Sequence, residues 1–267
     1  MGNERERQDD ANTYLCEKTG QRVPRSEPVC PKPEEACKYR SNCIIYAIEE
    51  DHVYSVSDNR SFTGCSIVSC GTLRHELEQL RRSGVLDADK VLYAAPGLHE
   101  WPNEFEKQVT RKLRAAKEIS NRAIVVYGSR CFVDTLNPER TTDSLIQEQE
   151  MNAVRVKAAN CVDMLASKEE RDRIGGEQKV LWLTPGWLRH WDFIFKDWDA
   201  AKFNEMYPRH DKAVVLDALG YVDELMAGSP ERILEISDKM QLPIESFAIS
   251  LERLKRLLAA QIAAITS

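Results

Sequence analysis

The sequence has no apolar run that approaches the ~18 residues needed to cross a membrane. Its first residues, 1–12, are polar and charged, unlike the apolar core of a secretory signal peptide. The net charge of −6 is mild, and no Lys/Arg-rich run is interleaved with aromatic residues. We therefore expect a cytoplasmic protein with neither a membrane nor a nucleic acid as its partner.

Several common motifs of nucleotide-binding proteins and hydrolases are also missing. The chain contains no Gly-x-Gly-x-x-Gly, no Walker loop and no Gly-x-Ser-x-Gly elbow. These absences argue against a standard dinucleotide site, an ATP site and an α/β-hydrolase nucleophile. There is no Cys-x-x-Cys pair either, which makes thiol–disulfide exchange a weak interpretation.

What the sequence does contain is an alternation of short apolar, β-branched runs with segments of helical periodicity. Such alternation predicts an α/β fold, with a mostly parallel sheet and helices on both of its faces. The length of 267 residues is enough to bury a full hydrophobic core. Strands are expected at 64–69, 91–94, 123–127, 154–158, 180–183, 213–216 and 246–249, and helices at 72–83, 103–120, 144–151, 162–174, 187–195, 230–240 and 251–264.

The first sixty residues differ in composition from the rest. We expect a disordered tail at 1–13, a small Cys-rich module at 14–60 and the α/β domain at 61–267. Four prolines among the cysteines of the module exclude a regular helix there. The runs 43–48 and 52–56, joined by an acidic turn, predict a β-hairpin within the module.

The eight cysteines require an explanation, because disulfides are rare in the cytoplasm and metal binding or catalysis is the better expectation. Four of them belong to the N-terminal module. They suit either a tetrahedral Zn²⁺ site or an iron–sulfur cluster, with a structural role expected. The spacing does not decide between the two metals. These four candidate metal ligands are Cys16, Cys30, Cys37 and Cys43.

Three further cysteines, Cys70, Cys131 and Cys161, each follow a short strand of the α/β domain. The carboxyl ends of parallel strands meet at one edge of a sheet, where ligands bind. Three thiolates there would hold an iron–sulfur cluster or Zn²⁺ and leave one coordination position open, as a catalytic metal requires. The alternative is that these are unrelated buried thiols that pack as small hydrophobic groups.

Other polar and aromatic residues are candidates for the rim of that site. His99 follows a strand and could complete the metal shell or transfer a proton. Arg130 could bind an anionic substrate group through its guanidinium fork, although a surface ion pair is the simpler interpretation. The tryptophans around Thr184 are expected mainly to pack in the core, with a stacking wall for a planar ligand as the alternative.

A family resemblance rests on several of the same residues. They are Cys70, Leu73 to Leu77, Gly97 to His99, Tyr127 to Cys131, Cys161 and Trp182 to Trp187. With these residues the stretch from Cys70 onward resembles domain-of-unknown-function family 1638, a family of α/β proteins. The resemblance implies a setting in anaerobic metabolism near corrinoid-dependent methyltransferases. Typical members carry Gly-Leu where Ser129-Arg130 stands and His-Asp where Ala159-Asn160 stands.

Two functions compete at this stage. The first is a cysteine-ligated metalloprotein with an open metal site at the strand ends, linked by the resemblance to one-carbon and corrinoid metabolism. Its partners would be a small anionic substrate and a protein such as a corrinoid methyltransferase. The second is a non-enzymatic metal or cluster carrier, or a maturation partner of another enzyme. The sequence does not decide whether the protein is an enzyme.

Overall fold

The computed structural model describes residues 13–16, 18–24, 31, 61–134 and 136–266. By its internal contacts the chain divides into two compact units, Met1–Asn59 and Arg60–Ser267. Among the described residues, none belongs to a helix that is long and apolar enough to span a bilayer.

The described part of the first unit is an antiparallel β-hairpin. Strands β1 (Thr13–Leu15) and β2 (Arg22–Pro24) pair with each other, and the Gly20 amide donates to the Cys16 carbonyl in the turn, at 2.8 Å. A hairpin was expected in this unit, but from other residues. The expected strands 43–48 and 52–56 lie outside the described residues.

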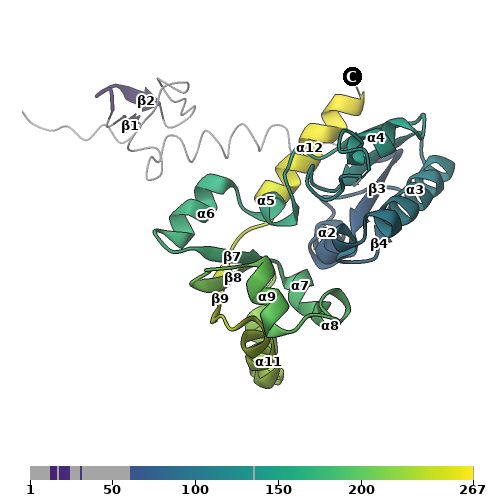
Figure 1. The fold of residues 1–267 in the computed structure, drawn as a ribbon. Helices are drawn as coiled ribbons and strands as arrows, with labels where there is room; N and C mark the ends of the chain where they lie inside the picture. Colours follow the sequence, from purple (N-terminus) through teal and green to yellow (C-terminus); the bar gives the residue numbers. More distant parts are fainter. Residues whose placement is uncertain (1–12, 17, 25–30, 32–60, 135, 267) are drawn as a thin grey trace, which may run out of the picture. The chain divides into compact units, whose positions relative to one another are not determined.

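The second unit begins with a four-stranded parallel sheet in the order β4-β3-β5-β6 (Figure 1). Its strands and connecting helices are β3 (Cys65–Cys70), 3-10 helix η2 (Gly71–Leu73), α2 (Arg74–Arg82), β4 (Lys90–Ala94), 3-10 helix η3 (Leu98–Glu100), α3 (Pro102–Ile119), β5 (Arg122–Val126), α4 (Thr142–Gln147), β6 (Asn152–Arg155) and α5 (Cys161–Leu165). From β3 the chain moves to β4 on one side, then crosses back to β5 on the other. The direction of winding therefore reverses between β3 and β5, and the crevice at such a point is where open α/β sheets bind ligands.

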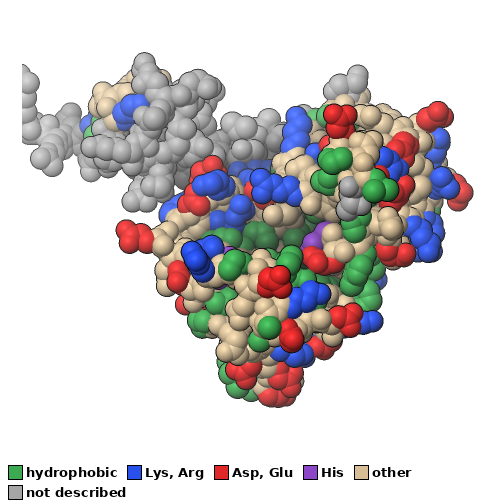
Figure 2. Space-filling model, in the orientation of Figure 1, with side chains coloured by type: hydrophobic (Ala, Val, Ile, Leu, Met, Phe, Trp, Pro, Cys, Tyr) green, Lys and Arg blue, Asp and Glu red, His purple; other side chains and the backbone are tan. Residues whose placement is uncertain are grey.

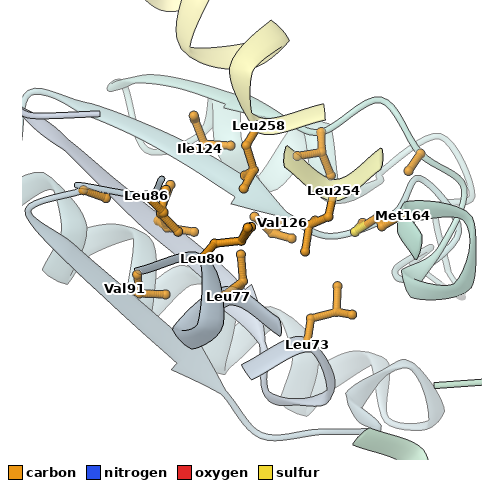
Figure 3. Close-up of a cluster of buried hydrophobic side chains, with 14 of the residues drawn as sticks. Leu73, Leu77, Leu80, Leu86, Val91, Ile124, Val126, Met164, Leu254 and Leu258 are labelled. Carbon is orange, nitrogen blue, oxygen red and sulfur yellow. The ribbon is translucent and has the colours of Figure 1, made fainter. Parts of the chain in front are cut away.

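Helices cover both faces of this sheet, as the sequence predicts. On one face α2 and the C-terminal helix α12 (Glu252–Thr266) pack against β3, β4 and β5, with Leu77 and Leu258 at the centre of the cluster (Figure 3). On the other face α3 and α4 pack through Phe105, Leu113 and Leu145. Burial on both faces explains why β3 and β5 are apolar along almost their whole length.

The remaining strands form a separate parallel sheet in the order β7-β8-β9. Its elements are α6 (Lys168–Gly175), β7 (Val180–Leu183), α7 (Pro185–Arg189), α8 (Trp191–Ile194), α9 (Ala200–Met206), β8 (Lys212–Asp217), α10 (Tyr221–Gly228), α11 (Pro230–Met240) and β9 (Ile244–Ala248). One face of this sheet is covered by an aromatic cluster around Trp191 and Phe203. From its other face, Leu216 and Trp182 join the core of the first sheet. The α/β class with parallel sheets is thus confirmed, whereas the division of the strands into two sheets was not anticipated.

Two differences in the helices have local causes. The helix expected at 162–174 is interrupted, because the Ser167 side chain accepts a hydrogen bond from the Glu170 amide and starts α6 anew with a capping box. Helices α9 and α10 were not predicted at all. Helix α9 is short, and it begins after Asp199, whose side chain accepts a hydrogen bond from the Lys202 amide.

The two sheets meet through a very close backbone contact. A Cβ atom on Gly186, in α7, would lie 1.9 Å from the carbonyl oxygen of Thr72, in η2. Only glycine allows this approach, which brings the turn after β7 against the turn after β3. The contact positions Trp187 beside the residues that follow the first sheet.

Candidate functional site

The three cysteines that follow β3, β5 and β6 line one small cavity, of about 30 Å³. Cys70 ends β3, Cys131 lies in the loop after β5, and Cys161 is the first residue of α5. This is the ligand-binding edge that the winding of the sheet indicates. The other lining residues are Thr72, Leu73, Leu98, His99, Phe105, Val126, Tyr127, Gly128, Met164 and Trp187.

Cys70 is held by the turn that immediately follows its own strand. The Thr72 hydroxyl donates to the Cys70 sulfur at 3.1 Å. The thiol itself reaches the Ala95 carbonyl only at 4.0 Å, which is a weak contact. Thr72 is 2% exposed, so this hydroxyl is fixed inside the fold.

Cys131 and Cys161 are brought together by a direct backbone contact between their loops. The amides of Ser129 and Arg130 donate to the carbonyls of Ala158 and Ala159, at 2.9 and 3.0 Å. The Gly128 amide donates to the Cys131 sulfur at 3.2 Å. A Cβ atom on Gly128 would lie 2.1 Å from the Ala159 oxygen, so this approach again requires glycine.

The loop before Cys161 also shows what residues 159 and 160 do here, where the family resemblance leads us to expect His-Asp. The Asn160 side chain accepts a hydrogen bond from the Asp163 amide at 2.9 Å and caps α5. Asp and Asn are equally good N-caps, so an Asp at position 160 would cap α5 in the same way. Ala159 contributes backbone contacts to Gly128 and Arg130, and these do not depend on its side chain.

Burial makes all three thiols reluctant to ionise. It raises the pKa of Cys70, and it raises the pKa values of Cys131 and Cys161 to about 12, with a further contribution from the neighbouring thiols of the same cavity. Each thiol is therefore protonated near neutral pH in this environment. A divalent cation would reverse that balance, because a coordinating thiol is deprotonated outright.

Two buried hydrogen-bond donors of this cavity have no partner of good geometry. They are the Tyr127 hydroxyl and the Trp187 indole N–H. Tyr127 lies beside Cys70, and burial together with Cys70 and Cys131 raises its pKa well above its usual value. Trp187 lies near enough to Cys161 to lower the pKa of that thiol slightly against the effect of burial. Unpaired buried donors are costly, and both can donate to a sulfur that becomes a thiolate.

His99 lies at the mouth of the cavity, with its side chain 32% exposed. Its ring stacks on Trp187 with centroids 5.5 Å apart, and its Nε2 lies 3.4 Å from a Glu100 carboxylate oxygen. Burial lowers the pKa of His99, and Glu100 opposes that effect only in part. The imidazole is therefore neutral near pH 7, the form that can bind a metal.

Arg130, unlike His99, does not lie at the mouth of the cavity. Its side chain is exposed, and it is not among the residues that line the cavity. Of the residues expected at the rim, His99 and Trp187 therefore line the cavity and Arg130 does not.

Of the four N-terminal candidates only Cys16 can be placed. It is a free thiol, 6% exposed, and it packs with Val23 and Tyr14 in the hairpin. Cys30, Cys37 and Cys43 lie outside the described residues. The separate N-terminal metal site stays a prediction.

The side chains of the described residues are not arranged as a complete metal site. Within residues 61–134 and 136–266 and the described part of the hairpin, no three or more His, Cys, Asp or Glu side chains are arranged to hold an ion. Cys65, Cys70, Cys131 and Cys161 are all free thiols. The cysteines share a cavity, but their sulfur atoms would have to turn toward a common point to bind one ligand.

Sequence reasoning missed one buried group near this site. Glu76, in α2, is 1% exposed, and neither of its carboxylate oxygens has a hydrogen-bond partner. The sequence does indicate that Glu76 is buried, because it lies three residues after Leu73 and four before Leu80, on the buried face of the helix.

Comparison with known proteins gives one match. The sequence model of a family described as protein of unknown function (DUF1638) matches residues 93–258, which is more than half of the chain. No curated protein and no solved structure matches. The matched region includes the loops that carry His99, Cys131, Cys161 and Trp187. The chain therefore belongs to the family of proteins of unknown function DUF1638.

Proposed function

We propose that Cys70, Cys131 and Cys161 bind one divalent metal ion, with the fourth coordination position directed toward His99. The observation that carries this proposal is the single cavity that all three thiols line at the switch point of the first sheet. Three thiolates and one exchangeable position are the ligand set of an open, Zn²⁺-type site.

The surroundings fit a single ion better than a cluster. The space in the cavity, about 30 Å³, is enough for roughly two water-sized groups, and a multi-iron cluster would have to displace packed side chains. The Tyr127 hydroxyl and the Trp187 indole N–H offer hydrogen bonds to the thiolates that a cation would create. We therefore favour zinc over an iron–sulfur cluster at this site.

Binding would require the three thiols to turn toward one point. Rotation about the Cα–Cβ bonds would turn the thiols inward, at the cost of the Thr72 and Gly128 contacts to sulfur. Because the three thiols start out protonated, binding would release their protons. The metal, when bound, would supply Lewis-acid activation or a lowered thiol pKa at the open position.

His99 would face a ligand at that open position. Its neutral imidazole can hold or accept a proton there, and its stacking on Trp187 fixes the plane of the ring. A small thiol or carboxylate is the ligand class that such a metal binds. A role in one-carbon metabolism beside a corrinoid methyltransferase stays a prediction from the family resemblance.

The test is metal analysis of the full chain purified without oxygen, in a background where the N-terminal cysteines 16, 30, 37 and 43 are serine. We expect about one zinc ion per chain in this parent, and its loss in Cys70→Ser, Cys131→Ser and Cys161→Ser. Cys65→Ser is the matched control, because Cys65 is buried at the other end of β3. Zinc binding to metal-free protein should release about three protons near pH 7.

Two outcomes would contradict the proposal: substoichiometric zinc in the parent, or equal zinc content in Cys131→Ser and Cys65→Ser. A carrier role is the second candidate, favoured by the absence of a preformed arrangement among the described thiols. Weak chelators would then remove the metal within minutes, and no added thiol or carboxylate would alter the spectrum of the cobalt-substituted protein.

A further inference from the structure

A larger cavity lies at the C-terminal end of α5, whereas the thiol site includes the first residue of that helix. Its volume is about 420 Å³, within the range of pockets that bind small molecules. It is bounded by the end of α5, by α6, by β9 and by the start of α12. Figure 2 shows Lys and Arg side chains gathered beside a hydrophobic hollow in the part of the molecule where Figure 1 draws α5 and α6.

The wall of this cavity is largely apolar. Leu165 is 2% exposed, and Ile174 and Ile249 pack partly against the core of the first sheet. Phe247, on the edge strand β9, is 44% exposed. By register Phe247 pairs with Leu216, so it belongs to the sheet face that turns away from the aromatic cluster of Trp191. An apolar body can therefore lie against one aromatic and several aliphatic side chains.

The charged residues of the cavity are mainly basic. Arg173, Arg253 and Arg256 line it together with a single carboxylate, Glu170. That carboxylate is already used locally, since its Oε2 accepts the Ser167 amide in the capping box of α6. The site therefore carries an excess of positive charge.

Arg253 is held in place by Asp163. Its Nε donates to the Asp163 carbonyl at 2.5 Å and its Nη2 to the Asp163 carboxylate at 3.3 Å. Asp163 also forms an ion pair with Arg171. Its single negative charge is therefore shared between two arginines and does not fully neutralise Arg253. A guanidinium that is oriented in advance loses less side-chain entropy when it binds an anion.

We propose that this cavity binds a small molecule with an apolar body and one carboxylate or phosphate group, the anion lying among the arginines and the apolar part against Phe247. This proposal goes beyond the metal site and does not depend on it. Apolar lining with a few convergent charged groups is the usual composition of such sites. The guanidinium fork suits both carboxylate and phosphate.

The probe for the test is anilinonaphthalene sulfonate, an anionic aromatic dye whose fluorescence rises on binding. We expect it to bind the full-length protein at one site. Naphthoate and naphthyl phosphate should displace it, and the more effective of the two identifies the preferred anion. Naphthol, which has the same ring without a charge, should compete at least tenfold less well, because it forms no charge-assisted hydrogen bond.

Arg173→Glu should weaken dye binding by about tenfold or more, since Arg173 is exposed and its reversal places a carboxylate at the cavity. Arg111→Glu on α3 changes the net charge equally but lies outside the cavity, and should change affinity less than about twofold. Equal effects of the two arginine variants, equal competition by naphthol, or no saturable binding would each overturn the proposal.

Discussion

Replacing Gly128 with alanine is expected to abolish metal binding at the three-cysteine site and to lower the free energy of unfolding by about 3 kcal/mol. The new Cβ atom would lie 2.1 Å from the Ala159 carbonyl oxygen and 2.5 Å from the Asn160 Cα. Both are backbone atoms, so no side-chain rotation can relieve the overlap. The loops of Cys131 and Cys161 would have to separate.

The separation would break the two amide–carbonyl hydrogen bonds that join these loops. Urea unfolding gives the stability change, and zinc analysis gives the loss of the site. Gly228→Ala is the matched control, because a Cβ atom there meets nothing within 4 Å and the residue ends helix α10. Its stability should stay within about 1 kcal/mol of the parent, with unchanged zinc content. A Gly128→Ala protein with parental stability and full zinc content would show that the two loops do not need this contact.

The second large effect is expected at Glu76, and it depends on pH. Burial raises the pKa of this carboxyl to about 7, and Asp217 adds to the shift while Arg189 opposes it. The unfolded chain ionises near the ordinary glutamate value of 4.5. Between these two values the folded state binds a proton that the unfolded state does not, so stability falls as pH rises toward 7.

Glu76→Gln removes this dependence. Relative to the parent, the variant should gain on the order of 3 kcal/mol between pH 4.5 and pH 8, from a shift in pKa of 4.5 to about 7. Urea unfolding at several pH values measures the difference. Glu118→Gln, at an exposed position of α3, is the control and should leave the pH profile unchanged. Parallel profiles for Glu76→Gln and the parent would mean that folding does not raise the pKa of Glu76.

Much of the fold was accessible from the sequence because local pattern and burial agree there. Strand β7 and helix α11 begin and end where the periodicity places them, β3 and β5 differ from expectation by one residue at each end, and β4 begins one residue earlier than expected. Strands β3 and β5 are buried on both faces, and most of their residues are apolar. Where a helix is short and begins at a side-chain cap, as at Asp199, the periodic pattern is too brief to detect.

The division into two sheets could not be predicted in the same way. A parallel strand looks alike in either sheet, and which sheet it joins depends on contacts between segments far apart in the sequence. One such contact is that of Gly186 with Thr72. The sequence contains the glycine but gives no sign of the carbonyl group that requires it.

For the site, the sequence showed which strands deliver cysteines to the edge of the sheet, but not the packing around them. The contributions of Tyr127 and Trp187 became visible only from their buried, unpaired donor groups. Arg130 shows the opposite limit. Its neighbours in sequence reach the cavity, while its own side chain is exposed. The side chain of a residue next to a candidate ligand on a turn can point in any direction. Spacing in the sequence alone does not determine that direction.

In the proposed site, three cysteines from three loops bind one ion and leave one position open. X-ray absorption at the zinc edge measures this directly, using the full chain with the N-terminal cysteines replaced by serine. We expect three sulfur ligands at about 2.3 Å and one nitrogen or oxygen ligand at about 2.0–2.1 Å. Addition of a small thiol should raise the sulfur count to four. A shell without sulfur, or with one sulfur only, would contradict the account.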